Sequence, residues 1–115
     1  MTASVSVAIA TFNRAAMVAE AVAGALRQSY APSEVVVSDD ASTDETPSVL
    51  AKLAAGDARV RLLRQQANSG GVENWNRAMA ATRGAYIAWC SDDDVFEPGH
   101  LAASVQFLEI GRAHV

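Results

Sequence analysis

Three groups of polar and acidic residues have the types and spacing to bind a charged ligand. They are Asp92-Asp93-Asp94, Asp39-Asp40 and the turn Thr11-Phe12-Asn13-Arg14. Adjacent carboxylates repel one another unless a cation lies between them. A hard divalent cation such as Mg²⁺ or Mn²⁺ relieves this repulsion and can also bridge to a diphosphate. The run 92–94 therefore predicts a metal site with Asp92, Asp93 and Asp94 as candidate ligands, against the alternative of a solvated turn that caps the next helix.

The other two groups suit the organic part of a nucleotide. The carboxylates of Asp39-Asp40 can accept hydrogen bonds from a base N–H or a ribose hydroxyl, because residues 42–44 already supply turn and cap chemistry. Phe12 offers a stacking face for a base, and Asn13 offers amide hydrogen bonds. The alternative for this turn is a plain helix N-terminus capped by Thr11 or Asn13.

A weaker set of candidates comes before the acidic run along the chain. Its members are Asn68, Gly70, Gly71, Asn76 and Arg77. Arg77 could pair with a phosphate or with the acidic run. A surface loop and an exposed helix face explain the set equally well.

The remaining reactive or aromatic side chains are expected to be structural. His100 and His114 have no ligand partner at a useful spacing. Cys90 ends a buried strand, which favours burial as a small apolar residue over nucleophilic chemistry. Trp75 and Trp89 are expected to pack rather than to form a platform for a sugar, with Trp75 the less certain of the two.

An alternation of strands and helices positions these groups. Strands are expected at residues 4–10, 34–38, 59–64 and 85–90. Helices are expected at 14–29, from a cap at Ser42 or Thr43 to 55, at 72–82, and from Pro98 to 108. This order predicts an α/β domain with a mostly parallel sheet and flanking helices. Ligands bind at the carboxyl ends of such strands, so the three polar groups are predicted to meet at one edge.

Composition and net charge limit the classes of function that the chain can have. The 115 residues are 50% apolar, which suits one small domain. The net charge of −4 argues against nucleic-acid or anionic-membrane partners. We find no signal peptide, and no apolar run approaches the roughly 20 residues that span a bilayer. The single Cys90 forms no internal disulfide. A cytoplasmic location is expected, or a peripheral one at the inner membrane face for the full-length protein.

The motifs resemble those of family 2 glycosyltransferases with the GT-A fold, from Val5 to Leu108. VSVAIATFNR resembles the family's V-S-V-I-I-P-T-Y-N-R, with Ala10 where proline is common. EVVVSDDASTDET resembles E-I-I-V-V-D-D-G-S-T-D-x-T, with Ala41 in place of glycine. The stretch NSGGVENWNRAMAATRGAYIAWCSDDDVFEPGHL resembles N-x-G-x-x-x-A-R-N-x-G-x-x-x-A-x-G-E-Y-I-x-F-L-D-x-D-D-x-x-x-P-x-x-L. Three ordered motifs at family-like spacing make the resemblance specific.

The resemblance implies the Rossmann-like, nucleotide-sugar-binding half of a GT-A enzyme. The implied reaction transfers a sugar from a nucleotide-diphosphate sugar, with a UDP-sugar favoured, to an unknown acceptor hydroxyl, with inversion and with Mg²⁺ or Mn²⁺ as cofactor. In the family, the general base lies well downstream of the acidic loop. The chain is therefore expected to hold the donor-binding part and no catalytic residue of its own.

The resemblance also implies roles for individual residues. Phe12 and Asp40 would contact a uracil-type base, and Asp92 would lie near the ribose. The pocket around the base would be shaped by Thr11, Asn13 and Asp39. Asp93 would coordinate the metal. Many members have an aspartate where this chain has Ser91, so the metal ligand among residues 92–94 is open by one position.

The last residues, EIGRAHV at 109–115, resemble a translated short-read sequencing adapter, GAG ATC GGA AGA GCA CAC GTC. The alternative is a native helix end with Gly111 just after the helix. We expect an incomplete donor-binding domain at 4–108 and a non-native tail at 109–115. Such a truncated chain is expected to bind a nucleotide weakly and not to transfer sugar.

Other functions fit the sequence less well. A nucleotidyltransferase would need a Gly-rich, basic loop after the first strand, which TFNRAAM lacks. A receiver-like regulatory module would carry its phospho-acceptor aspartate at the end of the third strand, where this chain has Arg64-Gln65-Gln66. A non-catalytic nucleotide-binding module remains an alternative.

Overall fold

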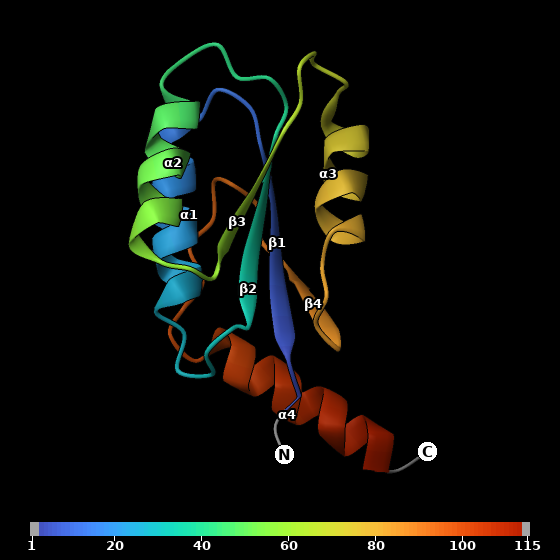
Figure 1. Ribbon diagram of the computed structural model, residues 1–115. Coiled ribbons are helices and arrows are strands. Elements are labelled where there is room, and N and C mark those ends of the chain that lie inside the picture. Colours follow the sequence, from blue (N-terminus) through green and yellow to red (C-terminus); the bar gives the residue numbers. More distant parts are fainter. Residues whose placement is uncertain (1–2, 114–115) are drawn as a thin grey trace.

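The computed structural model describes residues 3–113, and the side chains of residues 3–109. His114 and the end of the predicted tail lie outside the described residues. Strands and helices alternate strictly along the chain (Figure 1). The elements are β1 Val5–Thr11, α1 Ala15–Leu26, β2 Glu34–Asp39, α2 Thr46–Gly56, β3 Val60–Arg64, α3 Gly71–Ala80, β4 Tyr86–Trp89 and α4 His100–Ala113. Within this part of the chain, no helix has both the length and the apolar character needed to cross a membrane.

The four strands form one sheet in the order β3-β2-β1-β4, and every neighbouring pair is parallel. The register places Thr11 beside Asp39, and Asp39 beside Arg64. The predicted parallel α/β fold is therefore confirmed. An order of 3-2-1-4 is that of Rossmann-type sheets, whereas receiver domains have the order 2-1-3-4-5. The strand order thus argues against the receiver-like alternative.

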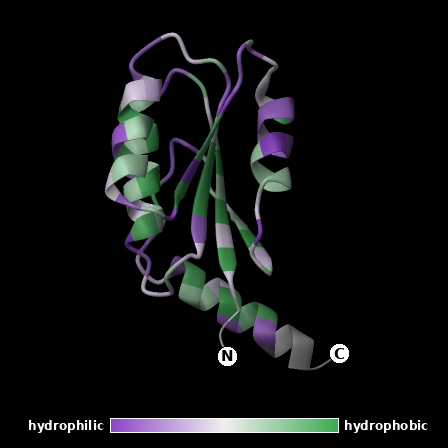
Figure 2. Ribbon diagram, in the orientation of Figure 1, coloured by the Kyte–Doolittle hydropathy of each residue, from purple (hydrophilic) through white to green (hydrophobic). Residues whose placement is uncertain are grey.

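Helices cover both faces of the sheet. Figure 1 shows α1 and α2 on one face, α3 on the other, and α4 across the end where β1 begins. All residues of β1 and β2 are buried, as in parallel strands that are covered on both sides. Figure 2 shows apolar residues along these strands and hydrophilic loops at the opposite end from α4.

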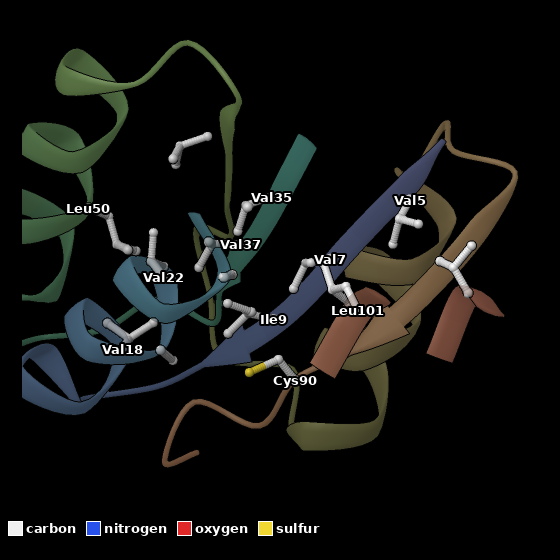
Figure 3. Close-up of a cluster of buried hydrophobic side chains, with 14 residues drawn as sticks. Val5, Val7, Ile9, Val18, Val22, Val35, Val37, Leu50, Cys90 and Leu101 are labelled. Atoms are coloured by element: carbon white, nitrogen blue, oxygen red, sulfur yellow. The ribbon is translucent and has the colours of Figure 1, made fainter. Parts of the chain in front are cut away.

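An apolar cluster joins the sheet to α1, α2 and α4 (Figure 3). Val7, Ile9 and Val37 of the central strands pack against Val18 and Val22 of α1. The same cluster contains Leu50, Leu101 and Cys90, so α2, α4 and the end of β4 share one core. Burying each such side chain contributes about 1.5–3 kcal/mol.

Three local details differ from the sequence-based expectations. The helical spacing of apolar residues in 14–29 predicts Met17 on the buried face, but its side chain is exposed, and Ala15 and Gly24 are buried. Pro98 lies in a turn before α4 rather than in its first turn. Ser42 and Thr43 do not cap the second helix, which begins at Thr46. The Ser42 hydroxyl bonds Asp39 and the Thr43 hydroxyl bonds Asn13 instead.

The start of α2 is held by Asp44. Its carboxylate accepts a hydrogen bond of 2.9 Å from the backbone N–H of Thr46. Glu45 occupies the cap position and makes no side-chain capping bond. The acids that the sequence places in the first turn lie before it, because α2 begins at Thr46, but Asp44 still suits the positive end of the helix dipole.

A buried ion pair fixes the amino ends of the strands, opposite the polar loops. The Glu34 carboxylate is 6% exposed and accepts hydrogen bonds from Ser6 Oγ at 2.6 Å, Arg61 Nη1 at 2.5 Å and the Arg83 backbone N–H at 2.6 Å. Burial acts to raise the pKa of Glu34, but these donors outweigh it, so the pKa lies below its ordinary value of 4.5. This cluster ties β1, β2 and β3 to the loop before β4.

Candidate functional site

A cleft of about 510 Å³ lies where the carboxyl ends of the strands meet the loops. Its walls come from the turn after β1, the end of β2, the loop and first turn of α3, and the loop after β4. The lining residues are Phe12, Arg14, Asp40, Asn68, Gly70, Gly71, Asn74, Trp75, Ser91 and Asp92. The predicted convergence of the three polar groups on one edge is therefore present in the fold.

Asp40 is a buried carboxylate fixed by the loop before α3. Its Oδ1 accepts hydrogen bonds of 2.9 Å from both the backbone N–H and the hydroxyl of Ser69, and its Oδ2 accepts one of 2.9 Å from Gly70 N–H. Burial acts to raise the pKa of Asp40, but these donors and the charge of Arg77 hold it below its ordinary value of 3.8. Asp40 is thus an ionised hydrogen-bond acceptor with a fixed orientation.

Asp92 is the second buried carboxylate of the cleft, and both of its oxygens have partners. Thr11 Oγ1 donates to Oδ2 at 2.9 Å, and Arg14 Nη1 donates to Oδ1 at 3.1 Å. Thr11 ends β1 and Arg14 precedes α1, so the turn after β1 determines how this carboxylate lies. Arg14 itself is half exposed.

The neighbouring aspartates are placed differently. Asp93 lies half exposed, with Oδ2 at 3.5 Å from Arg14 Nη1 and Oδ1 accepting a 2.5 Å hydrogen bond from Ser91 Oγ. The Ser91 bond lowers the pKa of Asp93, and Arg14 lowers it further against the effect of burial. Asp94 is exposed and accepts a hydrogen bond from Val95 N–H at 2.9 Å. Asp92 and Asp93 therefore share one cationic neighbour, and Asp94 does not take part.

The donor set at this point suits a hard cation in part. The carboxylate oxygens of Asp92 and Asp93 are the ligand type that Mg²⁺ and Mn²⁺ prefer, and Mg²⁺ commonly uses one or two carboxylates with phosphate and water. Among the described residues, no three acidic, histidine or cysteine side chains are grouped closely enough to hold a metal by themselves. A cation here would need further oxygens from a ligand such as a diphosphate.

Two of the predicted ligand residues hold the site together from behind the cleft. Asn13 has a positive φ of 52°, and its Oδ1 accepts hydrogen bonds from the backbone N–H groups of Thr43 at 2.8 Å and Asp44 at 3.3 Å. Asp39 Oδ1 accepts bonds from the backbone and hydroxyl of Ser42. Neither Asn13 nor Asp39 is among the cleft-lining residues.

One buried oxygen in this region lacks a hydrogen bond. Asp39 Oδ2 has no hydrogen-bond partner within the described residues, and its nearest cation is Arg64 Nε at 3.7 Å. Arg64 ends β3 and lies beside Asp39 in the sheet. Arg64 of β3 thus partly compensates the negative charge of the buried Asp39 carboxylate.

The weaker sequence set divides into lining and supporting residues. Asn68, Gly70 and Gly71 line the cleft, whereas Asn76 and Arg77 do not. Arg77 Nη1 donates to Ser69 Oγ at 2.7 Å, so it supports the residue that holds Asp40.

Asn74 was not identified from the sequence. Its amide receives a hydrogen bond from Ser38 Oγ at 2.6 Å and donates to the carbonyls of Thr11 at 3.2 Å and Ser38 at 3.0 Å. It therefore fastens α3 to the ends of β1 and β2. The sequence offers one signal: an asparagine surrounded by helix-forming positions, which is unfavourable unless its amide has partners.

The aromatic and thiol groups near the cleft have separate roles. Phe12 and Trp75 are partly exposed and line the cleft, and Trp75 packs against Trp89. Cys90 is buried, and burial together with the nearby aspartates 92–94 raises the pKa of its thiol to about 12. A thiol in this state is not a nucleophile, as the sequence predicted.

The fold and the cleft define the class of this protein. A parallel sheet of order 3-2-1-4, with a polar cleft at its carboxyl edge, is the architecture of Rossmann-like nucleotide-binding proteins. The family model for glycosyl transferase family 2 matches residues 6–115. The chain therefore belongs to glycosyl transferase family 2.

Curated relatives include bacterial glycosyltransferases. One is the GalNAc(5)-diNAcBac-PP-undecaprenol beta-1,3-glucosyltransferase of Campylobacter jejuni, 33% identical over 111 residues, which covers 96% of this chain and 36% of the relative. A second curated relative is the succinoglycan biosynthesis protein ExoO of Rhizobium meliloti, 34% identical over 111 residues, which covers 96% of this chain and 31% of the relative. The chain thus spans about a third of the length of these relatives.

Solved structures give the same result for the fold. The S. aureus TarS 1–349 structure with UDP superposes with a TM-score of 0.81 at 26% identity, covering 92% of this chain and 32% of that one. The mannosyltransferase PcManGT from Pyrobaculum calidifontis, in complex with GDP-Man and Mn²⁺, gives 0.78 at 26% identity, with 93% and 32% covered. The fold is that of the corresponding third of GT-A glycosyltransferases.

Proposed function

We propose that this chain is the donor-binding part of an inverting, metal-assisted glycosyltransferase that uses a nucleotide-diphosphate sugar, with a UDP-sugar favoured. The observation that carries the proposal is the meeting of Phe12, Asp40 and Asp92 in one cleft, although they follow three different strands. The structural neighbours that bind UDP or GDP-Man support it.

The roles of the cleft residues follow from their geometry. Phe12 offers a partly exposed ring on which a base can stack. Asp40 is ionised and rigidly held, which suits it to accept a hydrogen bond from a base N–H. Asn13, Asp39 and Arg77 act indirectly, by holding the residues that line the cleft.

Asp92 and Asp93 would hold the metal, and the exposed Asp94, whose carboxylate bonds Val95 N–H, would not. Both carboxylates approach the same Arg14 nitrogen, at 3.1 Å and 3.5 Å, so they lie close enough for one cation to contact both. The chemistry that Mg²⁺ or Mn²⁺ supplies when bound is neutralisation of the charge that develops on the departing diphosphate. Thr11 keeps Asp92 oriented through its hydrogen bond to Oδ2.

The described cleft residues do not supply a base for the acceptor hydroxyl. Asp40 and Asp92, its carboxylates, have their oxygens engaged by Ser69, Gly70, Thr11 and Arg14. Hydrogen bonds to an ionised carboxylate make it a weaker base, so neither group is suited to remove the acceptor proton. We therefore propose that acceptor binding and deprotonation belong to other parts of the whole enzyme, and that this chain alone does not transfer sugar.

Calorimetry of UDP binding with and without Mn²⁺ tests the proposal. The 115-residue chain is expected to bind UDP more tightly when Mn²⁺ is present, and Asp93→Ala is expected to lose that difference. Asp94→Ala is the matched control and is expected to behave like the wild type. A folded chain that binds neither UDP nor GDP would contradict the proposal, as would sugar transfer to an acceptor at an ordinary enzymatic rate.

A further inference from the structure

Arg14 is the only cationic residue among the described residues that line the cleft. Its guanidinium lies 3.1 Å from Asp92 Oδ1 and 3.5 Å from Asp93 Oδ2. The cleft also contains the carboxylate of Asp40. Arg14 is therefore the group that balances the negative charge of the acidic loop at the cleft.

The pairing with Asp92 matters because that carboxylate is only 10% exposed in its side chain. A buried carboxylate without compensation is costly, so its oxygens need donors or a cation. Thr11 serves Oδ2 and Arg14 serves Oδ1. A divalent cation that binds Asp92 must therefore approach an oxygen that already has a partner.

Arg14 is the partner that can give way. Thr11 is buried at the end of β1, whereas the Arg14 side chain is 48% exposed and lies on the turn before α1. A guanidinium and a divalent cation at the same oxygen repel each other. The planar guanidinium also matches phosphate oxygens well, so a diphosphate in the cleft offers it a new partner.

We propose that Arg14 is an exchangeable counterion: it pairs with Asp92 and Asp93 when no divalent cation is bound, and it moves to the donor diphosphate when the cation takes those carboxylates. This inference rests on the proposed donor site. It makes Arg14 a competitor of the metal and, at the same time, a ligand of the nucleotide. The two roles predict opposite effects of removing its charge.

Titration of Arg14→Gln with Mn²⁺ alone, and then with UDP at saturating Mn²⁺, tests this. Loss of the competing charge is expected to tighten Mn²⁺ binding about three- to tenfold in the absence of nucleotide, which electron paramagnetic resonance of free Mn²⁺ measures directly. UDP binding is expected to weaken about tenfold, because a charge-assisted contact to the diphosphate is lost. Arg14→Lys keeps the charge without the planar guanidinium, so it is expected to restore the wild-type Mn²⁺ affinity but only part of the UDP affinity.

Arg83→Gln is the matched control, since it removes the same charge at the opposite edge of the sheet, where the residue bonds Glu34 through its backbone N–H. It is expected to leave both affinities within about twofold of wild type, because a distant exposed charge is largely screened. Unfolding curves of each variant verify that the fold is retained.

Each outcome decides the inference. If Arg14→Gln weakens Mn²⁺ and UDP binding together, or leaves Mn²⁺ binding unchanged, Arg14 is not a competitor of the metal. If wild type binds UDP with Mn²⁺ but Arg14→Gln does so equally well, the diphosphate role is wrong while the proposed function stands. If the wild-type chain binds neither Mn²⁺ nor UDP, the proposed function and this inference both fail.

Discussion

The hydroxyl of Thr11 donates a 2.9 Å hydrogen bond to the carboxylate of Asp92 across 81 residues of sequence. The bond joins the end of β1 to the loop after β4, which are brought together because these two strands pair in parallel. It shows how the sheet, rather than any local motif, assembles the cleft.

Asn74→Ala is expected to destabilise the domain by about 2–3 kcal/mol, since buried groups of Thr11 and Ser38 lose their partner. Urea unfolding followed by circular dichroism measures the change. Asn76→Ala, on the same helix but exposed, is the control and is expected to change stability by less than about 0.5 kcal/mol. Equal effects of the two substitutions would show that Asn74 does not fasten α3 to the sheet.

Ala41→Gly is expected to stabilise the protein. Ala41 has a φ of 62°, in the left-handed region that favours glycine. Relief of about 1–2 kcal/mol of backbone strain outweighs the roughly 0.5–1 kcal/mol by which glycine favours the unfolded chain. The midpoint temperature of thermal unfolding should therefore be higher for Ala41→Gly than for the wild type. Ala51→Gly, at an exposed interior position of α2, should lower the free energy of unfolding by about 1 kcal/mol. If both variants were less stable than the wild type, the backbone at residue 41 would not be strained.

Such details show what the sequence can predict. The strands were predictable because β1 and β2 are rich in Val, Ile and Ala, and their alternation with helices implied a parallel sheet. The location of the cleft at the carboxyl ends of the strands was predictable too, because polar residues come directly after the strands. The left-handed backbone at Ala41 could be suspected only because the family motif has glycine there. An alanine by itself does not indicate a positive φ.

The side-chain partners were less predictable. Ser42 and Thr43 have the residue types of helix caps, but Ser42 bonds the nearby Asp39, and Asn13 of the turn after β1 bonds both residues. Arg14 was recognised only as part of a polar turn, because its pairing with Asp92 depends on strand order. Long-range pairings of this kind leave no mark on local sequence pattern.

Stability at low pH should depend on Glu34. Its pKa is lowered in the folded state, so its contribution to stability is fully present above its ordinary value of 4.5 and is lost as the pH falls through the folded-state value. At pH 7, Glu34→Gln is expected to cost about 2 kcal/mol, because the bonds to Arg61 and Ser6 are weakened. Below pH 4.5 the difference in free energy of unfolding between wild type and Glu34→Gln should become smaller. A difference that stays constant down to pH 3 would show that this carboxylate is not the titrating group.

Cys90 should be inert in the folded protein. Its thiol is buried with a pKa of about 12, so the thiolate is scarce at pH 8. Labelling by a disulfide reagent at pH 8 is expected to be at least about a hundredfold slower in the native chain than in urea, because the reaction requires the thiolate. Comparable rates in the two states would show that the core around Cys90 is open.

Mapping of UDP and metal binding by ¹H–¹⁵N NMR on the labelled chain tests the central claim most directly. With UDP and Mg²⁺, we predict that the shifted amides cluster at Phe12, Asp40, Ser69 and Gly70, and that replacement of Mg²⁺ by Mn²⁺ broadens signals most strongly around Asp92 and Asp93. Amides near Glu34, at the opposite edge of the sheet, should stay unchanged. Perturbations centred on the Glu34 edge, or no perturbation at saturating UDP, would contradict a donor site in this cleft.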